Sequence, residues 1–322
     1  MRSSVVAIVG CLAVACGGHG SAGDGPLDGA ASDAQTDARG PLVEAGADAH
    51  GSPVDGGADT SVPSGQDAGG DAPGATLDAP ADAPDAGPPQ AVGLPMYVDP
   101  TSSPALWTQA NASAPTVALL IANPDSGPGA AVDPQYTQAI AAAHAAGQTI
   151  IGYIHTSSAG RAIADVEADI DSCYSFYPAI DGVFSDETAE DPSTVASYYV
   201  PLYQYVKAKS GAHVVVLNPG TMIDESFMTA GDVVVTFEDV YANYTAGAYA
   251  SDPAWVATYP RWRFWHLVLS ASTTADMQDA VTLSRQRNVG YVYVTDQPPA
   301  TAYQELVTGA YWQAELAAVT AP

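Results

Sequence analysis

From residue 92 onward, apolar runs alternate with longer segments that have the spacing of helices. The apolar runs are rich in Val, Ile, Phe and Tyr and carry few charges, which is typical of strands buried on both faces of a parallel sheet. Eight such runs predict eight strands. They are Leu94–Val98, Thr116–Ile121, Thr149–Ile154, Gly182–Ser185, His213–Leu217, Val233–Phe237, Phe264–Leu269 and Gly290–Thr295.

The segments between the runs are long enough for helices, and several have one apolar face. The segment that opens at Thr273 has Asp276 in its first turn, where a carboxylate suits the helix dipole. Strands alternating with helices over about 230 residues favour a closed (β/α)8 TIM barrel. The alternative is an open doubly wound sheet, which would normally carry a Gly-rich phosphate loop that this sequence lacks. The predicted helices include Pro134–Ala146, Ile163–Tyr177, Thr194–Ser210, Thr273–Asn288 and Tyr303–Val319.

The stretch from residue 17 to residue 91 has a different composition. It consists almost entirely of Ala, Gly, Asp, Pro and Ser, and it contains no aromatic residue. Such a chain cannot bury enough apolar surface to offset the entropy lost on ordering. We therefore predict a disordered, self-repelling linker over residues 17–91, followed by one barrel domain over residues 92–322.

The first 16 residues have the pattern of an export signal. Met1 and Arg2 precede an apolar run that is too short to span a bilayer as a helix. Small residues before Cys16 resemble a bacterial lipoprotein signal, with Cys16 as the lipidated residue and Cys11 as the alternative. An ordinary cleaved signal is the other reading. We expect an exported protein at the bacterial cell surface or in the periplasm, held to the membrane only by a lipid anchor, with release from the cell as the alternative.

Net charge limits the kinds of ligand that the protein would bind, and the cysteine count limits its disulfides. The net charge is −27, and residues before 92 contain 13 of the 36 acids and 2 of the 9 bases, so the barrel carries about −16. This excess of negative charge argues against nucleic acid or anionic lipid as a partner and suits a neutral or cationic ligand. Cys173 is the only cysteine beyond the signal, so we expect a buried thiol and no intrachain disulfide. We expect a monomer without a cofactor.

Polar and acidic residues gather where the predicted strands end. In a (β/α)8 barrel these ends form one mouth, which holds the active site. Crowded carboxylates repel one another, so one acquires a raised pKa while another stays ionised, as glycoside hydrolysis requires. We predict Asp186 and Glu238 as the catalytic pair, with Glu187 as a third acid. Helix capping by single acids and a metal site with His155 are the alternatives, and no metal-ligand spacing supports the second.

Sugar binding also needs flat apolar rings and hydrogen-bonding groups near the mouth. Aromatic residues and strand-end polar residues meet this need, whereas His266 lies inside a strand and is expected to be a core histidine. The substrate-binding candidates are Tyr97, Asp99, Asn123, His155, Arg161, Asn218, Tyr241, Trp265 and Asp296.

Several of these segments together resemble a known family. The segments 97–100, 121–129, 152–157, 181–187, 216–221 and 237–239 resemble the spherulin 4 family, also called spherulation-specific family 4, with motifs in order over about residues 94–315. The resemblance implies a (β/α)8 barrel and hydrolysis of α-1,4-linked N-acetylgalactosamine in galactosaminogalactan, a fungal biofilm exopolysaccharide. It places the essential acids at Asp186, Glu187 and Glu238. Arg161 falls where the family often has Tyr-Gly-Thr-Arg, but Ser158 replaces the tyrosine.

Three functions are compatible with these patterns. The first is an endo-acting glycoside hydrolase for a hexosamine-containing polysaccharide, which uses the strand-end carboxylates. The second is a carbohydrate-binding protein whose catalysis has been lost, and the third is a structural cell-surface protein. The retained acids favour the hydrolase, since neither alternative requires an organised acid cluster.

Overall fold

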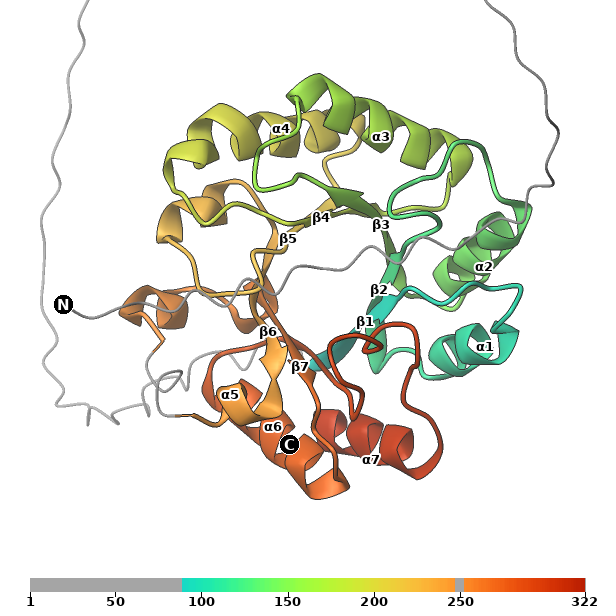
Figure 1. The fold of residues 1–322 in the computed structure, drawn as a ribbon, viewed down its shortest axis with the longest axis vertical. Helices are drawn as coiled ribbons and strands as arrows, with labels where there is room; N and C mark the ends of the chain where they lie inside the picture. Colours follow the sequence, from blue (N-terminus) through green and yellow to red (C-terminus); the bar gives the residue numbers. More distant parts are fainter. Residues whose placement is uncertain (1–88, 247–251, 322) are drawn as a thin grey trace, which may run out of the picture. The chain divides into compact units, whose positions relative to one another are not determined.

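The chain folds into a closed barrel of eight parallel strands in the order β1 to β8, with helices around it (Figure 1). The structure is a computed structural model that describes residues 89–246 and 252–321. The predicted barrel is confirmed. The predicted signal, Cys16, Cys11 and most of the predicted linker lie outside the described residues. The strands are β1 Ala91–Met96, β2 Val117–Ala122, β3 Thr149–His155, β4 Gly182–Asp186, β5 Val214–Leu217, β6 Val233–Val240, β7 Phe264–Leu269 and β8 Tyr291–Val294.

The barrel closes where β1 meets β8. Ala91 and Val92 pair in parallel with Tyr291 and Val292. The first strand therefore spans Ala91–Met96 rather than the predicted Leu94–Val98, and it begins one residue inside the predicted linker. Gln90, which precedes β1, is buried, and its side-chain amide donates hydrogen bonds to the hydroxyl of Ser284 and to the carbonyl of Val289. The start of the folded domain is thus fixed by sheet pairing as well as by composition.

The helical layer is regular where helices α3 and α4 lie side by side on one side of the barrel (Figure 1). It departs from the regular (β/α)8 pattern after β5 and after β6. In the described parts of the segments after β5 and β6, where a regular barrel has full helices, the helical elements are short turns. The helices and turns are α1 Pro104–Ala112, α2 Pro134–Ala145, α3 Ile163–Phe176, the π-helical turn η1 Val195–Tyr199, α4 Val200–Lys209, the 3-10 turn η2 Glu225–Thr229, α5 Tyr241–Tyr244, the 3-10 turns η4 Ala254–Thr258 and η5 Arg261–Arg263, α6 Thr274–Gln286 and α7 Gly309–Thr320.

The last two helices show how local chemistry sets a helix start. Thr273 and Asp276 form a reciprocal capping box at the start of α6, which confirms the predicted boundary. The last helix was predicted from Tyr303, but α7 begins at Gly309 after the capping position Thr308. Two prolines at 298 and 299 precede a series of turns, so Tyr303 lies in the loop between β8 and α7. This correction matters because it frees the Tyr303 side chain to reach the barrel mouth.

Aromatic side chains fill the barrel interior. Trp265 of β7 crosses the barrel to Phe184 of β4, with ring centroids 6.0 Å apart. A Cβ on Gly93 would lie only 2.6 Å from the Trp265 ring, so glycine makes room for the indole. Trp265 is 0% exposed. The structure therefore corrects the prediction of Trp265 as a substrate contact, because its ring is sealed inside the core.

Two other buried residues behave as the sequence predicts. Cys173 is buried, and burial raises the pKa of its thiol to about 12. His266 is buried in β7, where its ring nitrogens hydrogen-bond the hydroxyls of Tyr244 and Thr236 at 2.8 and 3.0 Å. Both residues belong to the packing of the barrel. Within residues 89–246 and 252–321, the helices are all too short or too polar to cross a membrane.

Candidate active site

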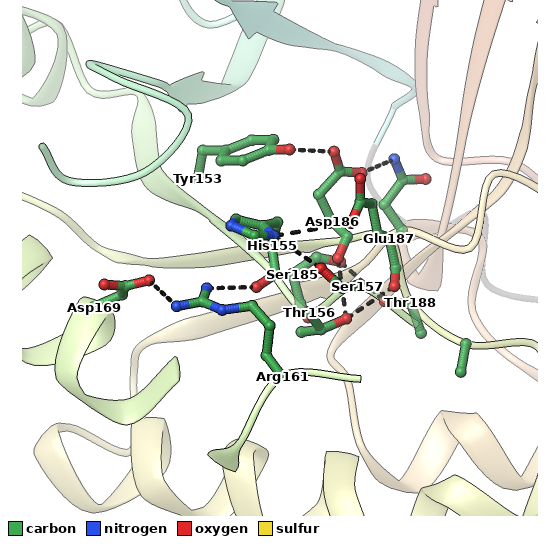
Figure 2. Close-up of polar contacts among 12 residues, drawn as sticks. Tyr153, His155, Thr156, Ser157, Arg161, Asp169, Ser185, Asp186, Glu187 and Thr188 are labelled. Carbon is green, nitrogen blue, oxygen red and sulfur yellow. Dashed lines mark hydrogen bonds and ion pairs between the residues drawn. The ribbon is translucent and has the colours of Figure 1, made fainter. Parts of the chain in front are cut away.

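Asp186 is the last residue of β4 and points into the barrel mouth, the end of the barrel formed by the carboxyl ends of the strands. Phe184 and Asp186 are two residues apart and so share a face of the strand, and Phe184 packs inside the barrel. Asp186 is 8% exposed. The hydroxyl of Tyr153, on the neighbouring strand β3, donates a hydrogen bond of 2.6 Å to Oδ2 of Asp186 (Figure 2).

Asn218 joins the two predicted catalytic acids. It follows β5, between β4 and β6, and its Nδ2 donates hydrogen bonds of 2.7 Å to Oδ1 of Asp186 and 2.7 Å to Oε2 of Glu238. These two carboxylate oxygens are therefore no farther apart than twice 2.7 Å. The backbone N–H of Gly220 donates to Oδ1 of Asn218 at 3.0 Å, which fixes the orientation of the amide. Gly220 has a φ of 67°, which favours glycine in this tight turn.

Tyr303 completes the cluster and was not among the predicted site residues. Its hydroxyl donates a hydrogen bond of 2.8 Å to Oε1 of Glu238. The ring of Tyr97, at the end of β1, contacts both tyrosines edge to face, with centroids 5.6 Å from Tyr153 and 5.3 Å from Tyr303. Tyr97, Tyr153 and Tyr303 thus form an aromatic arc whose two ends bind the two acids. The prolines before Tyr303 were the sequence signal that it lies in a loop.

The surroundings of the two acids raise the pKa of both. Burial, and then the negative charge of Asp186, raise the pKa of Glu238 to about 7, while the Asn218 and Tyr303 hydrogen bonds oppose the shift. Burial also raises the pKa of Asp186, and the charge of Glu187 adds to this. Among the described residues, no ion pair includes Asp186 or Glu238. Near neutral pH Glu238 is therefore poised to hold a proton beside Asp186.

Glu187 lies apart from this pair. It has a φ of 51°, so the backbone turns sharply after Asp186. Its side chain is 43% exposed, and its Oε2 lies 3.8 Å from Nδ1 of His155 (Figure 2). The loop after β3 holds this turn, because the Ser158 N–H donates to the Glu187 carbonyl at 2.8 Å. Glu187 and His155 therefore stand together on the rim of the mouth.

Arg161 is held by residues outside the acid pair. Its guanidinium donates to the carbonyl of His155 at 2.9 Å and to Oδ2 of Asp169 in α3 at 2.7 Å. Figure 2 shows that the guanidinium points away from the Asp186 carboxylate. The geometry gives Arg161 a role in bracing the loop after β3, and its predicted contact with substrate stays a prediction.

Four further substrate-binding candidates make hydrogen bonds at the ends of β1, β2, β6 and β8. Asp99, Asn123 and Asp296 each accept hydrogen bonds from their own loops. Asp99 and Asp296 are exposed, and Asn123 is half-buried. The hydroxyl of Tyr241 donates to Oδ2 of Asp279 in α6 at 2.8 Å, which ties its ring to the helical layer. The structure does not bring Tyr241 into contact with the acid pair.

The part of the chain that the structure describes contains no group of three or more His, Cys, Asp and Glu side chains arranged to hold a metal ion. The groups around Asp186 and Glu238 are the amide of Asn218 and the phenols of Tyr153 and Tyr303.

Comparison with known proteins identifies the family of this chain. The sequence model of "Spherulation-specific family 4" matches residues 91–319, which is the whole barrel. This chain belongs to spherulation-specific family 4. Spherulin-4 of Physarum polycephalum is 36% identical over 214 residues, which are 63% of this chain and 62% of that protein. The match thus spans less than two thirds of the length of this family member.

Two solved structures are also similar. The crystal structure of Aspergillus clavatus Sph3 in complex with GalNAc has 26% sequence identity and a TM-score of 0.62, covering 73% of this chain and 99% of that chain. The glycoside hydrolase domain of PelA from Pseudomonas aeruginosa is a more distant match, with 13% identity and a TM-score of 0.39, covering 66% of this chain and 96% of that chain. The first of these two structures contains bound GalNAc.

Proposed function

We propose that this protein is a glycoside hydrolase that cuts α-1,4-linked N-acetylgalactosamine inside a polysaccharide of the galactosaminogalactan type. The observation that carries the proposal is the pair of acids, the buried Asp186 and the half-buried Glu238, held by one amide at the barrel mouth. Membership of spherulation-specific family 4 and the likeness to a GalNAc-bound protein support the class of sugar.

The electrostatics favour different roles for the two acids. Glu238, whose pKa is raised to about 7, is the general acid, and Asp186 is the nucleophile. Asp186 attacks the anomeric carbon, the bond to the glycosidic oxygen breaks, and the proton of Glu238 goes to that oxygen. Water then gives its proton to Glu238, its oxygen bonds to the anomeric carbon, and Asp186 leaves as a carboxylate. The enzyme returns to its starting state.

The spacing of the acids favours retention of configuration. Retaining glycosidases have carboxyl groups about 5 Å apart, whereas inverting enzymes place them about 6.5–9.5 Å apart to admit a water molecule. The facing oxygens of Asp186 and Glu238 lie no farther apart than twice 2.7 Å, since both bind Nδ2 of Asn218. This leaves no room for a nucleophilic water between those oxygens and supports a covalent glycosyl–Asp186 intermediate.

The rim of the mouth supplies the remaining contacts in this proposal. Tyr97 offers a ring edge beside the acids, and His155 and Glu187 offer polar groups on one side. Asp99 and Asp296 offer exposed carboxylates from the ends of two other strands. Contacts around the rim would bind sugars on both sides of the cleaved bond, which is why we propose endo action on a chain.

The setting of the enzyme is also a proposal. The signal-like residues before Cys16 and the Asp-rich linker would export the barrel and hold it at a distance from a lipid anchor. A monomer tethered in this way would search for polysaccharide near the cell surface. Radiolabelled palmitate incorporation that is lost in Cys16→Ser, and retained in Cys11→Ser, would support this arrangement.

The test of the hydrolase is the release of reducing ends from galactosaminogalactan by the full chain. We expect release by the parent protein and its loss in Asp186→Asn and Glu238→Gln. Asp171→Asn, which changes an exposed acid of α3 away from the mouth, is the matched control and should retain activity. Circular dichroism establishes that each variant is folded.

The second candidate, a carbohydrate-binding protein without catalysis, predicts a different result. In that case no reducing ends appear from galactosaminogalactan or from related hexosamine polymers, while the polymer still co-sediments with the protein. Unchanged release in both Asp186→Asn and Glu238→Gln would also reject the proposed mechanism.

A further inference from the structure

All four oxygens of the catalytic pair are occupied by hydrogen-bond donors. Nδ2 of Asn218 donates to Oδ1 of Asp186 and to Oε2 of Glu238. The hydroxyl of Tyr153 donates to Oδ2 of Asp186, and the hydroxyl of Tyr303 donates to Oε1 of Glu238. Each acid thus has one oxygen that faces the shared amide and one oxygen that faces a tyrosine.

The two kinds of donor differ in what they permit. The amide nitrogen of Asn218 can donate hydrogen bonds but cannot accept them. The orientation of the amide is fixed because its Oδ1 accepts a hydrogen bond from the Gly220 N–H. A proton on the amide-facing oxygen of either acid would repel the amide hydrogen that already points at it. A phenol hydroxyl can rotate and accept a hydrogen bond instead. A proton on a tyrosine-facing oxygen is therefore compatible with the same positions of the heavy atoms.

We propose that Tyr303 is a positioning residue that directs the catalytic proton of Glu238 to Oε1 and eases its release by donating to the carboxylate that forms, and that Tyr153 keeps Asp186 ionised for attack. The inference rests on the proposed function and assigns the route of the proton within that site. Both phenols stabilise an ionised carboxylate, but Asp186 is ionised before the reaction, whereas Glu238 becomes ionised only when its proton has left.

The proton transfer follows from this arrangement. Before the reaction, Oε1 of Glu238 carries the proton and the Tyr303 oxygen can accept it in a hydrogen bond. When substrate binds, the Oε1 proton passes to the glycosidic oxygen, which takes the electron pair of the breaking bond. The hydroxyl of Tyr303 then rotates to donate to the new carboxylate, which is the hydrogen bond that the structure contains. No other proton donor or acceptor is needed for this step.

The surroundings of the pair match these tasks. The groups that face Glu238 from neighbouring elements are Asp186 from β4, Tyr303 from the loop before α7, and the amide of Asn218. Tyr97 and Tyr293 lie near Tyr303. Burial, and then the charge of Glu238, raise the pKa of Tyr303 well above its usual range, so its phenol stays neutral.

Asp186 has different neighbours. Tyr153 from β3 and Asn218 from β5 donate hydrogen bonds that favour its ionised form, whereas the adjacent Glu187 disfavours it. Glu187 is itself near His155, which stands at the end of β3. Loss of the Tyr153 hydroxyl would therefore leave Asp186 beside the charge of Glu187 with one donor fewer.

The experiment compares Tyr303→Phe and Tyr153→Phe through the pH dependence of kcat/KM for the full chain on galactosaminogalactan. Loss of a donor to a carboxylate raises the pKa of that carboxylate. The pH profile of kcat/KM is expected to be bell-shaped. In Tyr303→Phe its alkaline limb, set by protonated Glu238, should move up by about one pH unit, which widens the profile. In Tyr153→Phe the acid limb, set by ionised Asp186, should move up by about one pH unit, which narrows the profile.

Tyr205→Phe is the matched control. It removes a phenol that donates to Asp171 on the outer helices, and neither limb should move. A folded Tyr303→Phe enzyme with both limbs unchanged would overturn the proposal, because a purely structural hydroxyl lowers activity without moving a limb. A shift of the acid limb in Tyr303→Phe would also overturn it, since the proton would then not reside on Glu238.

A direct titration separates this inference from the proposed function. Carbon NMR of protein labelled at the glutamate side-chain carboxyl reports the protonation of Glu238 without any substrate, once its signal is assigned by its absence in Glu238→Gln. We expect the midpoint to rise by about one pH unit in Tyr303→Phe, even if no polymer is cleaved. Equal midpoints in the two proteins would overturn the role of Tyr303, whatever the activity.

Discussion

Acidic residues stand at both ends of the barrel, but they have different partners. At the amino ends of the strands, Asp181 accepts the backbone N–H of Ile150 at 2.9 Å and lies 3.1 Å from the ring of His144. At the same end Asp232 accepts the backbone N–H of Val215 at 2.8 Å and pairs with a lysine, Lys207, at 2.7 Å. These carboxylates bond to the sheet and to basic side chains.

The acids at the mouth have no such support. Asp186 and Glu238 share the neutral amide of Asn218, and each also accepts a hydrogen bond from a tyrosine hydroxyl. Among the described residues, no ion pair includes either acid. The comparison teaches that burial of a carboxylate is not in itself a sign of function. A carboxylate bonded to backbone N–H groups and a basic side chain stabilises the fold, whereas two carboxylates held together by neutral donors store repulsion that catalysis can use.

The largest effect should come from neutralising the acids at the mouth. Asp186→Asn and Glu238→Gln each lower kcat by about a thousandfold or more, since a nucleophile or general acid is lost. Their thermal stability stays equal to that of the parent or rises, because the substitution removes repulsion. Activity and melting temperature measured on the same samples test this. A variant that loses activity only because it melts at a lower temperature would remove the distinction between the two ends.

The opposite pattern is expected at the other end of the barrel. Asp232→Ala removes the acceptor of the Val215 N–H and the partner of Lys207, so the free energy of unfolding falls by about 2–3 kcal/mol. The kcat of the folded variant stays within about twofold of the parent. Asp232 lies at the amino ends of the strands, whereas the mouth is at their carboxyl ends. Urea unfolding and kinetics below the transition measure both. A tenfold fall in kcat without destabilisation would contradict the structural role.

The free energy of unfolding should depend on pH because of Glu238 at the mouth. The pKa of Glu238 is raised to about 7, so between about pH 4.5 and 7 the native protein keeps a proton that the unfolded chain has released. Stability therefore falls as pH rises through this window, by on the order of 3 kcal/mol. Glu315, buried in α7 with a pKa raised to about 8, adds a fall of the same sign.

Single substitutions separate these two contributions. Urea unfolding of Glu238→Gln and Glu315→Gln at about pH 5 and about pH 8 should give a smaller fall than the parent in each case. Glu315 accepts the backbone N–H of Val294 with one oxygen and is not in contact with the acid pair, so Glu315→Gln keeps its activity. A pH dependence in Glu238→Gln that equals that of the parent would show that this acid does not hold a native-state proton.

The smallest effect should come from Arg161, which lies near the mouth yet has the partners of a structural residue. Arg161→Ala removes hydrogen bonds to the His155 carbonyl and to Asp169, at a cost of about 1 kcal/mol in stability. We expect KM to change by less than about threefold, because the guanidinium points away from Asp186 (Figure 2). A tenfold rise in KM at unchanged stability would restore Arg161 as a substrate contact.

Much of the fold could be predicted because buried parallel strands leave continuous apolar runs. The same logic located Asp186 and Glu238, since polar residues at strand ends converge on one mouth. The prediction for Trp265 was wrong, and its place near the start of β7 was the warning, because the first residues of a strand lie away from the mouth. The position of a residue along its strand is therefore as informative as its type.

The finer geometry could not be predicted from the sequence. Asn218 was expected to bind sugar, but which atoms its amide meets depends on the turn at Gly220 and on the stagger of β4, β5 and β6. Tyr303 was missed because it was placed in a helix, although the prolines before it favour a loop. Rotamers and loop paths depend on packing between distant segments, which no local pattern encodes.

The most direct test of the central claim is the configuration of the first product. Proton NMR of an early time course, with the full chain and an oligosaccharide of α-1,4-linked N-acetylgalactosamine, distinguishes the two anomers before they equilibrate. Two carboxylates as close as Asp186 and Glu238 predict that the α-anomer appears first, through a glycosyl–Asp186 intermediate. Initial appearance of the β-anomer would mean that water attacks directly, and it would contradict the account of the pair as nucleophile and acid.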